Sequence, residues 1–266
     1  MCNEVSKVIT EIRAKVPLVQ AITNYVTIND CANILLSFGA SPAMVEAYDE
    51  SYDFAQISNG VYINTGTLTK EQEAAAVMAA ISAKENNVSL VVDPVGCGAI
   101  KRKVEVIEKI ALLGKIDVIK GNGGEIKFLA GVNAEVRGVD SVDDGNGLVE
   151  AAKALAKKFK CIVAATGEKD VVTDGKRVAI IYNGVEMLTK VTGAGCMVGA
   201  LCAAAVGAYD DKFIATVAAV TAMGIAGEKA YEEAKLPGSF RVKLMDSIYL
   251  IDEKEISEKA RIEFSS

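Results

Sequence analysis

The chain has 266 residues, of which 51% are hydrophobic, so it can bury a sizeable core. A net charge of −6 at pH 7 argues against a general nucleic-acid binder, which needs a basic surface. The absence of histidine excludes Ser-His-Asp catalysis and the usual zinc ligand sets. The cysteines form no C-x-x-C pair, and the charged N-terminus has no signal-peptide core, so we expect a cytoplasmic protein with reduced thiols.

Hydrophobic spacing predicts helices and short buried strands that alternate along the chain. In chain order, the predicted elements are a helix over 3–15, a strand over 18–23, a helix over 27–38, a strand over 61–66, a helix over 69–86, strands over 89–95 and 117–122, helices over 124–129 and 147–159, a strand over 161–167, a hairpin over 172–181, helices over 194–208 and 212–234, and a C-terminal helix. Thr27 or Asn29 is expected to begin the second helix and Gly39 to end it, and Thr69 is expected to cap the third.

This alternation predicts an α/β fold with a central, mostly parallel sheet and helices on both faces. No repeat or low-complexity linker divides the chain, so residues 1–266 are expected to form a single domain. Residues 191–209 carry no charge and approach the length of a membrane span, but they are rich in Gly and Ala. We therefore expect a buried core helix there and no association with a membrane. Ligands of such folds bind beyond the carboxyl ends of the strands.

Two of the predicted strand ends carry ionisable side chains. Asp93 follows a buried strand, where its carboxylate could hold Mg²⁺ through water or could simply cap the next turn. Lys120 and Glu125 flank a glycine-rich turn before a helix, so Lys120 could reach a phosphate and Glu125 a metal. The alternative for Glu125 is a helix cap, because a carboxylate is favourable near a helix N-terminus.

Two further strand ends carry small and hydroxyl residues. Thr166 and Gly167 follow a strand, as a nucleotide-contacting hydroxyl and glycine would, although such a pair is also common turn punctuation. Residues 193–196 open an Ala-rich helix, where small side chains let backbone amides approach an anion at the positive end of the helix dipole. The same dipole is expected to lower the pKa of Cys196, unless this residue is only a small side chain packed in a tight loop. The chain contains neither a Walker A loop nor a dinucleotide fingerprint.

Taken in order, these segments resemble the hydroxyethylthiazole kinase family of the ribokinase-like superfamily. The resemblance runs from VPLVQAITNYVTINDCANILLSFGASPAM through VVDPVGCGA, IKGNGGEI and AATGEKDVVTDG to VTGAGCMVGAL. It implies a ribokinase-like fold and a homotrimer with sites at subunit interfaces. The activity implied is Mg²⁺- and ATP-dependent phosphorylation of the alcohol of 4-methyl-5-(2-hydroxyethyl)thiazole in thiamin salvage.

The resemblance also assigns roles to the residues that match the motifs of the family. The expected thiazole-binding residues are Asn24, Met44 and Gly193. The expected ATP-binding residues are Lys120 and Thr166, and the expected magnesium-organising residues are Asp93 and Glu125. The expected anion hole consists of Gly193, Ala194, Gly195 and Cys196.

Cys196 stands where most ribokinase-like kinases have an Asp that serves as general base, and the thiazole kinases characteristically have Cys at this position. The transition state of phosphoryl transfer demands little help from a base, so we expect Cys196 to position the hydroxyl and to assist modestly. The chain has Lys120 where the family usually has Arg, and Gln20 where many members have His. Two alternatives stay open: a kinase for another small alcohol such as hydroxymethylpyrimidine, and an ATP-linked dehydratase of the same fold.

Overall fold

The computed structural model describes residues 2–131 and 146–265, and a single sheet runs through this part of the chain. Its nine described strands lie in the order β2-β1-β3-β4-β5-β6-β7-β8-β9. Their bounds are β1 Leu18–Ile22, β2 Ser41–Ala43, β3 Gly60–Asn64, β4 Ser89–Asp93, β5 Val118–Asn122, β6 Ile162–Thr166, β7 Asp170–Thr173, β8 Val178–Ile181 and β9 Ile262–Ser265. Strands β1 to β6 pair in parallel with one another, and β7, β8 and β9 join the far end of the sheet in antiparallel pairs. The predicted mostly parallel sheet is therefore confirmed.

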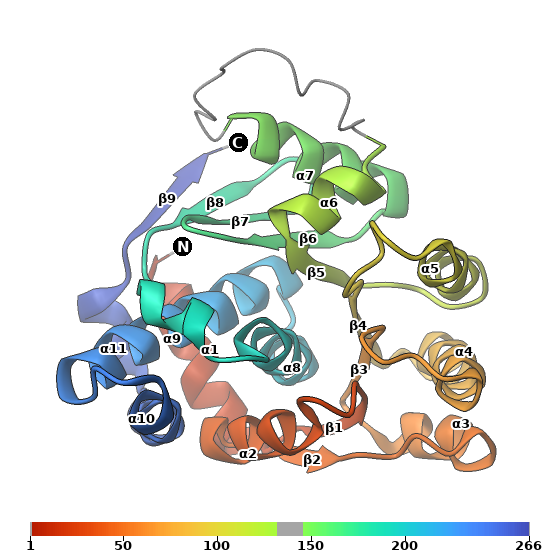
Figure 1. The fold of residues 1–266 in the computed structure, drawn as a ribbon, viewed down its shortest axis with the longest axis horizontal. Coiled ribbons are helices and arrows are strands. Elements are labelled where there is room, and N and C mark those ends of the chain that lie inside the picture. The colour runs from red at the N-terminus through yellow and green to blue at the C-terminus, as the bar shows by residue number, and fades with distance from the viewer. Residues whose placement is uncertain (1, 132–145, 266) are drawn as a thin grey trace.

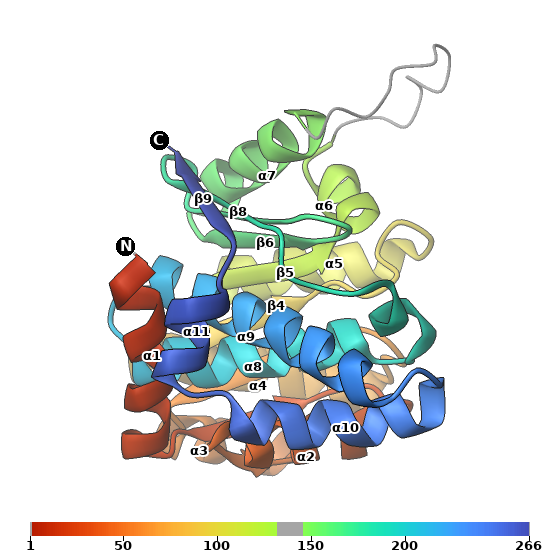
Figure 2. The ribbon, with the colours of Figure 1, turned by 90° about the vertical axis from the view of Figure 1, so that its left-hand side faces the viewer.

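Helices cover both faces of the sheet. They are α1 Cys2–Lys15, α2 Ile28–Phe38, α3 Tyr48–Ile57, α4 Lys70–Glu85, α5 Lys101–Leu113, α6 Gly123–Leu129, α7 Asn146–Phe159, the 3₁₀ helix η1 Glu186–Lys190, α8 Ala194–Ala208, α9 Lys212–Glu233, α10 Pro237–Leu250 and α11 Glu253–Lys259. Helices α3 to α7 pack on one face, and α1, α2 and α8 to α11 pack on the other (Figure 1). Figure 2 shows α1 beside α11 in the outer part of the second layer. The alternation of short strands and helices therefore produced the expected layers.

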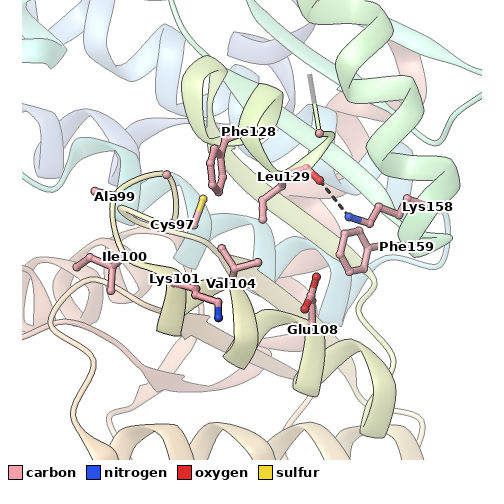
Figure 3. A pocket seen from close by; sticks show the side chains of 12 residues that line it. Cys97, Ala99, Ile100, Lys101, Val104, Glu108, Phe128, Leu129, Lys158 and Phe159 are labelled. Carbon is pink, nitrogen blue, oxygen red and sulfur yellow. Dashed lines mark hydrogen bonds between the residues drawn. The ribbon is translucent and has the colours of Figure 1, made fainter. Parts of the chain in front are cut away.

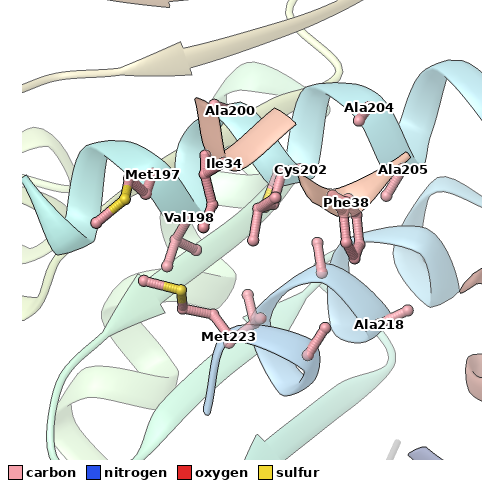
Figure 4. Close-up of a cluster of buried hydrophobic side chains, with 14 of the residues drawn as sticks. Ile34, Phe38, Met197, Val198, Ala200, Cys202, Ala204, Ala205, Ala218 and Met223 are labelled. Carbon is pink, nitrogen blue, oxygen red and sulfur yellow. The ribbon is translucent and has the colours of Figure 1, made fainter. Parts of the chain in front are cut away.

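The centre of the second layer is formed by α8 and α9, whose facing side chains are apolar and buried (Figure 4). Most of α8 is buried, so the prediction of a core helix within 191–209 is confirmed. In the described part of the chain, α9 is the one helix long and apolar enough to cross a membrane, and 89% of its apolar window is buried inside the fold. Such burial is what a core helix of a globular domain requires.

The predicted caps can be compared directly with the helix ends. Gly39 ends α2 at φ +96°, a left-handed conformation that glycine adopts without strain. Thr69 begins α4 in a capping box with Gln72, as expected. Thr27 rather than Asn29 precedes α2, but its side chain makes no cap hydrogen bond.

Several elements were not predicted. Strand β2 has only three residues and includes Pro42 at the edge of the sheet, where the missing N–H does no harm. Strand β9 pairs with β8 across a long sequence separation, which local pattern does not reveal. Helices α3 and α5 were also missed, although Val106 and Ile110 of α5 lie at helical spacing. The C-terminal region contains two helices, α10 and α11, where one was expected.

Candidate active site

The parallel strands bring their carboxyl ends to one edge of the sheet. Asn64 at the end of β3 is in register with Asp93 at the end of β4, and Asn122 of β5 is in register with Thr166 of β6. Helix α8 packs on β3, β4 and β5. Side chains from well-separated parts of the sequence therefore meet beside the N-terminal turn of α8, where open α/β sheets bind ligands.

A buried ion pair lies at this edge. The Lys120 ammonium is 3.5 Å from Oδ2 of Asp93, and the two side chains are 4% and 0% exposed. Burial raises the pKa of Asp93 to about 6, although Lys120 opposes this shift. Burial alone would lower the pKa of Lys120, but the nearby Asp93 and Cys196 outweigh it and the pKa is raised. Lys120 therefore keeps a positive charge at the sheet edge.

Asp93 and Glu125 could together hold a metal ion. Oδ1 of the fully buried Asp93 has no hydrogen-bond partner among the described residues. The Glu125 oxygens accept hydrogen bonds from Gly96 N–H and Asn122 N–H, each at 2.9 Å, so Glu125 is indeed a helix cap, but each oxygen keeps a free lone pair. No group of three or more His, Cys, Asp or Glu side chains that could hold a metal occurs in the described ranges. These residues fit a Mg²⁺ that takes its remaining ligands from water and phosphate.

The first turn of α8 has the geometry of an anion-binding turn. Gly193 precedes the helix at φ +83°, and a β-carbon there would lie 2.4 Å from Cγ2 of Thr27. A β-carbon on Gly195 would lie 3.0 Å from Nζ of Lys120, so the ammonium group sits next to this turn. The first N–H groups of a helix have no intrahelical acceptor. Ala194 N–H donates to Val191 O at 3.4 Å, so the turn combines the amides of Gly195 and Cys196 with the helix dipole and a buried cation.

Cys196 lies in the same turn and is only half-buried. Its sulfur accepts hydrogen bonds from Nδ2 of Asn24 at 3.4 Å and from Nδ2 of Asn64 at 3.3 Å. The expected lowering of its pKa is wrong. Burial and the negative charge of Asp93 raise the pKa of Cys196, and they outweigh the opposing effect of Lys120. Near neutral pH the residue is therefore a thiol rather than a thiolate.

A cavity of about 770 Å³ opens beside this turn. Thr166 and Gly167 line it from the end of β6, and Ala194 and Gly195 line it from α8. Its apolar lining residues come from the loop before η1, from η1 itself, and from α8 and α9. They are Val185, Leu188, Val198, Val220 and Met223. The cavity thus joins an anion-binding turn to an apolar wall, a combination that suits the phosphates and base of a nucleotide.

Asp170, which the sequence analysis did not single out, also lines this cavity. Its Oδ1 accepts a hydrogen bond from Gly167 N–H at 2.9 Å, and burial raises its pKa to about 7. A second cavity of about 490 Å³ lies between α5, α6 and α7, with Cys97, Phe128 and Lys158 in its lining (Figure 3). None of the predicted site residues lines this second cavity.

The N-terminal segment that contains Asn24 and Met44 also lies against α8. Asn24 reaches the sulfur of Cys196, as described above, and Met44 packs against the core that contains α8. The fully buried Gln20 donates hydrogen bonds from Nε2 to Val45 O at 3.2 Å and to Oγ of Ser51 at 2.9 Å. Gln20 therefore anchors the segment that directly follows Met44.

Asn64 is a site residue that the sequence analysis missed. Its Nδ2 reaches the Cys196 sulfur and lies 3.2 Å from Oδ2 of Asp93, while its Oδ1 accepts a hydrogen bond from Nδ2 of Asn24 at 3.0 Å. One amide thus links both sides of the site. The signal in the sequence was a polar side chain at the end of a buried strand, the same signal that identified Asp93.

The model of the hydroxyethylthiazole kinase family matches residues 9–254. The chain belongs to this family. It is 67% identical over 257 residues to hydroxyethylthiazole kinase 1 of Clostridium botulinum strain Hall, with 97% of this chain and 98% of the relative aligned. It is 59% identical over 260 residues to hydroxyethylthiazole kinase of Clostridium kluyveri, which covers 98% of this chain and 97% of that relative.

Two solved structures can be compared with this hydroxyethylthiazole kinase family member. Hydroxyethylthiazole kinase from Pyrococcus horikoshii OT3 aligns with a TM-score of 0.91 at 40% identity, covering 98% of this chain and 99% of that one. Pyridoxal kinase from Staphylococcus aureus aligns with a TM-score of 0.57 at 16% identity, over 77% of this chain and 86% of that one. The second likeness shows the shared ribokinase-like fold alone.

Proposed function

We propose that this kinase transfers the γ-phosphoryl group of ATP to the hydroxyl of 4-methyl-5-(2-hydroxyethyl)thiazole, the step that family membership assigns to thiamin salvage. The observation that carries the proposal is the turn over 193–196, which opens onto the Thr166 cavity beside the Lys120–Asp93 pair. The 67% identity to a named hydroxyethylthiazole kinase over 97% of the chain supports the choice of alcohol. The whole chain, 1–266, acts as one kinase domain in this proposal.

ATP is placed in the cavity with its base against the apolar wall and its phosphates toward the turn. Thr166 lines the cavity, and its hydroxyl, which donates to Gly121 O at 3.3 Å without ligand, would turn from that carbonyl to donate to a phosphate. Lys120 supplies positive charge from beside Gly195. Asp93 and Glu125 would hold Mg²⁺, which neutralises phosphate charge when it is bound. The free amides of the turn stabilise the charge that develops on the transferred group.

The thiazole alcohol is placed beside Asn24, Met44 and Gly193. Tyr25 and Val26 directly follow Asn24 and are 54% and 61% exposed, although both are large apolar or aromatic residues. A second copy of the chain that covers this edge would bury them and close the substrate pocket. This exposure supports an assembly of copies with the sites at subunit interfaces; that the assembly is a homotrimer and acts in the cytoplasm is proposed from the family resemblance.

The chemistry asks little of a base. The alcohol oxygen attacks the γ-phosphorus as the bond to the β-phosphate oxygen breaks, and the transition state is loose. Because the pKa of Cys196 is raised, its side chain is a thiol that orients the hydroxyl beside Asn24 and Asn64, and the alcohol proton passes late in the step to an oxygen of the transferred phosphoryl group.

We expect the Cys196→Ala variant to slow turnover about tenfold without abolishing it, since a loose transition state needs only modest help from a base. Cys196→Asp is expected to be at least as active as the wild type, because a carboxylate is the better proton acceptor. Steady-state kcat for the three proteins measures this. An Ala variant faster than the Asp variant would contradict the assigned role.

The substrate assignment is tested by ADP release from Mg-ATP with hydroxyethylthiazole, with hydroxymethylpyrimidine and with no acceptor. We expect release that depends on the thiazole alcohol. Release with hydroxymethylpyrimidine alone would make the protein a kinase for a different small alcohol. Clear ATP binding without release in any arm would refute the proposed function while leaving the fold unaffected.

A further inference from the structure

Tyr62 lies in the middle of β3 and is one of the largest fully buried side chains. Its ring packs against α8 at Gly199, where an added β-carbon would come within 2.6 Å of Cε2 and 2.8 Å of the hydroxyl oxygen. Gly199 therefore provides the space that the ring fills. The ring and the helix fit each other so closely that neither can shift without the other.

The hydroxyl of Tyr62 lies at the junction of three site residues. It accepts a hydrogen bond from Nδ2 of Asn64 at 2.9 Å, and it is 3.0 Å from Oδ2 of Asp93 and 2.9 Å from the carbonyl oxygen of Cys196. A phenol carries one proton, so the hydroxyl donates to one of these two acceptors and holds the other within contact distance. A residue of the rigid central sheet thus touches both the buried carboxylate and the backbone of the anion-binding turn.

We infer that Tyr62 is a positioning residue for phosphoryl transfer: its hydroxyl fixes the first turn of α8 against Asp93 and Asn64. This inference rests on the function proposed above. Tyr62 is fully buried and acts through the turn rather than by touching substrate. It holds the amides of the turn and the thiol of Cys196 in the positions that the transition state requires. A displacement of such groups by about 1 Å can lower the rate about 10²-fold.

The test variant is Tyr62→Phe, which keeps the ring in the Gly199 space and removes the hydroxyl. We expect kcat to fall about tenfold while KM for ATP and for the thiazole alcohol changes by less than about twofold, because the lost contact acts on the transition state. In the ligand-free protein, amide hydrogen exchange of residues 194–198 should become about tenfold faster, with β3 and β4 unchanged.

Two further variants sharpen the test. Gly199→Ala pushes against the Tyr62 ring from the helix side and should lower kcat in the same way. Tyr52→Phe removes another tyrosine hydroxyl that hydrogen-bonds a carboxylate, that of Glu85 on the exposed side of α4, and should change neither kcat nor exchange. The exchange measurement needs no turnover, so it shows whether the Tyr62 hydroxyl holds the turn even if the wild type releases no ADP.

The outcomes are distinct. A local rise in exchange at the turn, together with a fall in kcat alone, supports the inference. Wild-type kcat in Tyr62→Phe would overturn it, and so would a fall in kcat with unchanged exchange over 194–198. Faster exchange throughout the sheet would show a structural residue only, which also overturns it.

Discussion

Lys120→Met is expected to destabilise the protein by about 3–5 kcal/mol, because it leaves the buried Asp93 carboxylate without its cation. It should also lower kcat/KM by about 10²–10³, the cost of removing one group that stabilises charge in the transition state. Both effects are expected because the Lys120 and Asp93 side chains are almost fully buried, with the ammonium 3.5 Å from Oδ2 of the carboxylate. Urea unfolding and steady-state kinetics with ATP and the thiazole alcohol measure the two effects.

A double variant separates the two consequences. Lys120→Met combined with Asp93→Asn removes both charges, so most of the lost stability should return while activity stays low. Lys212→Met serves as the control, because it also removes a cation from a buried carboxylate: the Lys212 ammonium is 2.7 Å from Oδ1 of Asp117. Asp117 has a second cation, Lys115, at 3.6 Å. Asp117 keeps a partner, so this control should lose much less stability and no activity. Equal losses in Lys120→Met and Lys212→Met would contradict the special role of the sheet-edge pair.

Gly193→Ala is expected to lower kcat/KM by about 10²-fold or more, because the anion-binding turn depends on this residue. Its φ of +83° is unfavourable for alanine and costs about 1–3 kcal/mol. The new β-carbon would also lie 2.4 Å from Cγ2 of the buried Thr27, so either α8 or α2 must move. Kinetics with both substrates, together with the melting temperature, measure the change.

Gly131→Ala is the matched control for backbone strain. Gly131 has φ +76°, but an added β-carbon would meet no atom of the described residues within 4 Å. Both variants therefore carry the cost of a positive φ, and only Gly193→Ala also moves the turn. We expect Gly131→Ala to lose stability and keep its kcat/KM. An equal loss of activity in the two variants would show that strain alone explains the effect of Gly193→Ala.

Much of the site could be located from the sequence because strand ends carry a local signal. Asp93 follows a buried apolar run, and in a parallel sheet the ends of such runs meet at one edge. Helix caps were predicted for the same reason: the Thr69 and Gly39 caps depend on residues within one turn of the helix end. Family motifs then added the alcohol and the nucleotide, which local patterns alone left open.

What local patterns missed depends on long-range pairing. Tyr62 reads as an ordinary residue of a strand, and only the packing of α8 on β3 brings it and Asn64 to Cys196, more than 130 positions along the chain. Likewise, β9 pairs with β8 at the far edge of the sheet, which depends on the path of the C-terminal chain.

The sequence by itself determined the class of fold, the edge of the sheet that carries the polar residues, and the family. Each of these depends on apolar periodicity or on motifs that are contiguous along the chain. The tertiary structure alone decided the protonation of Cys196. The helix dipole, which is readable from the sequence, lowers a thiol pKa, but burial and the neighbouring Asp93 raise it more. Burial and the charge of Asp93 both come from the fold around the residue, because desolvation and the distance between charges are properties of packing in space.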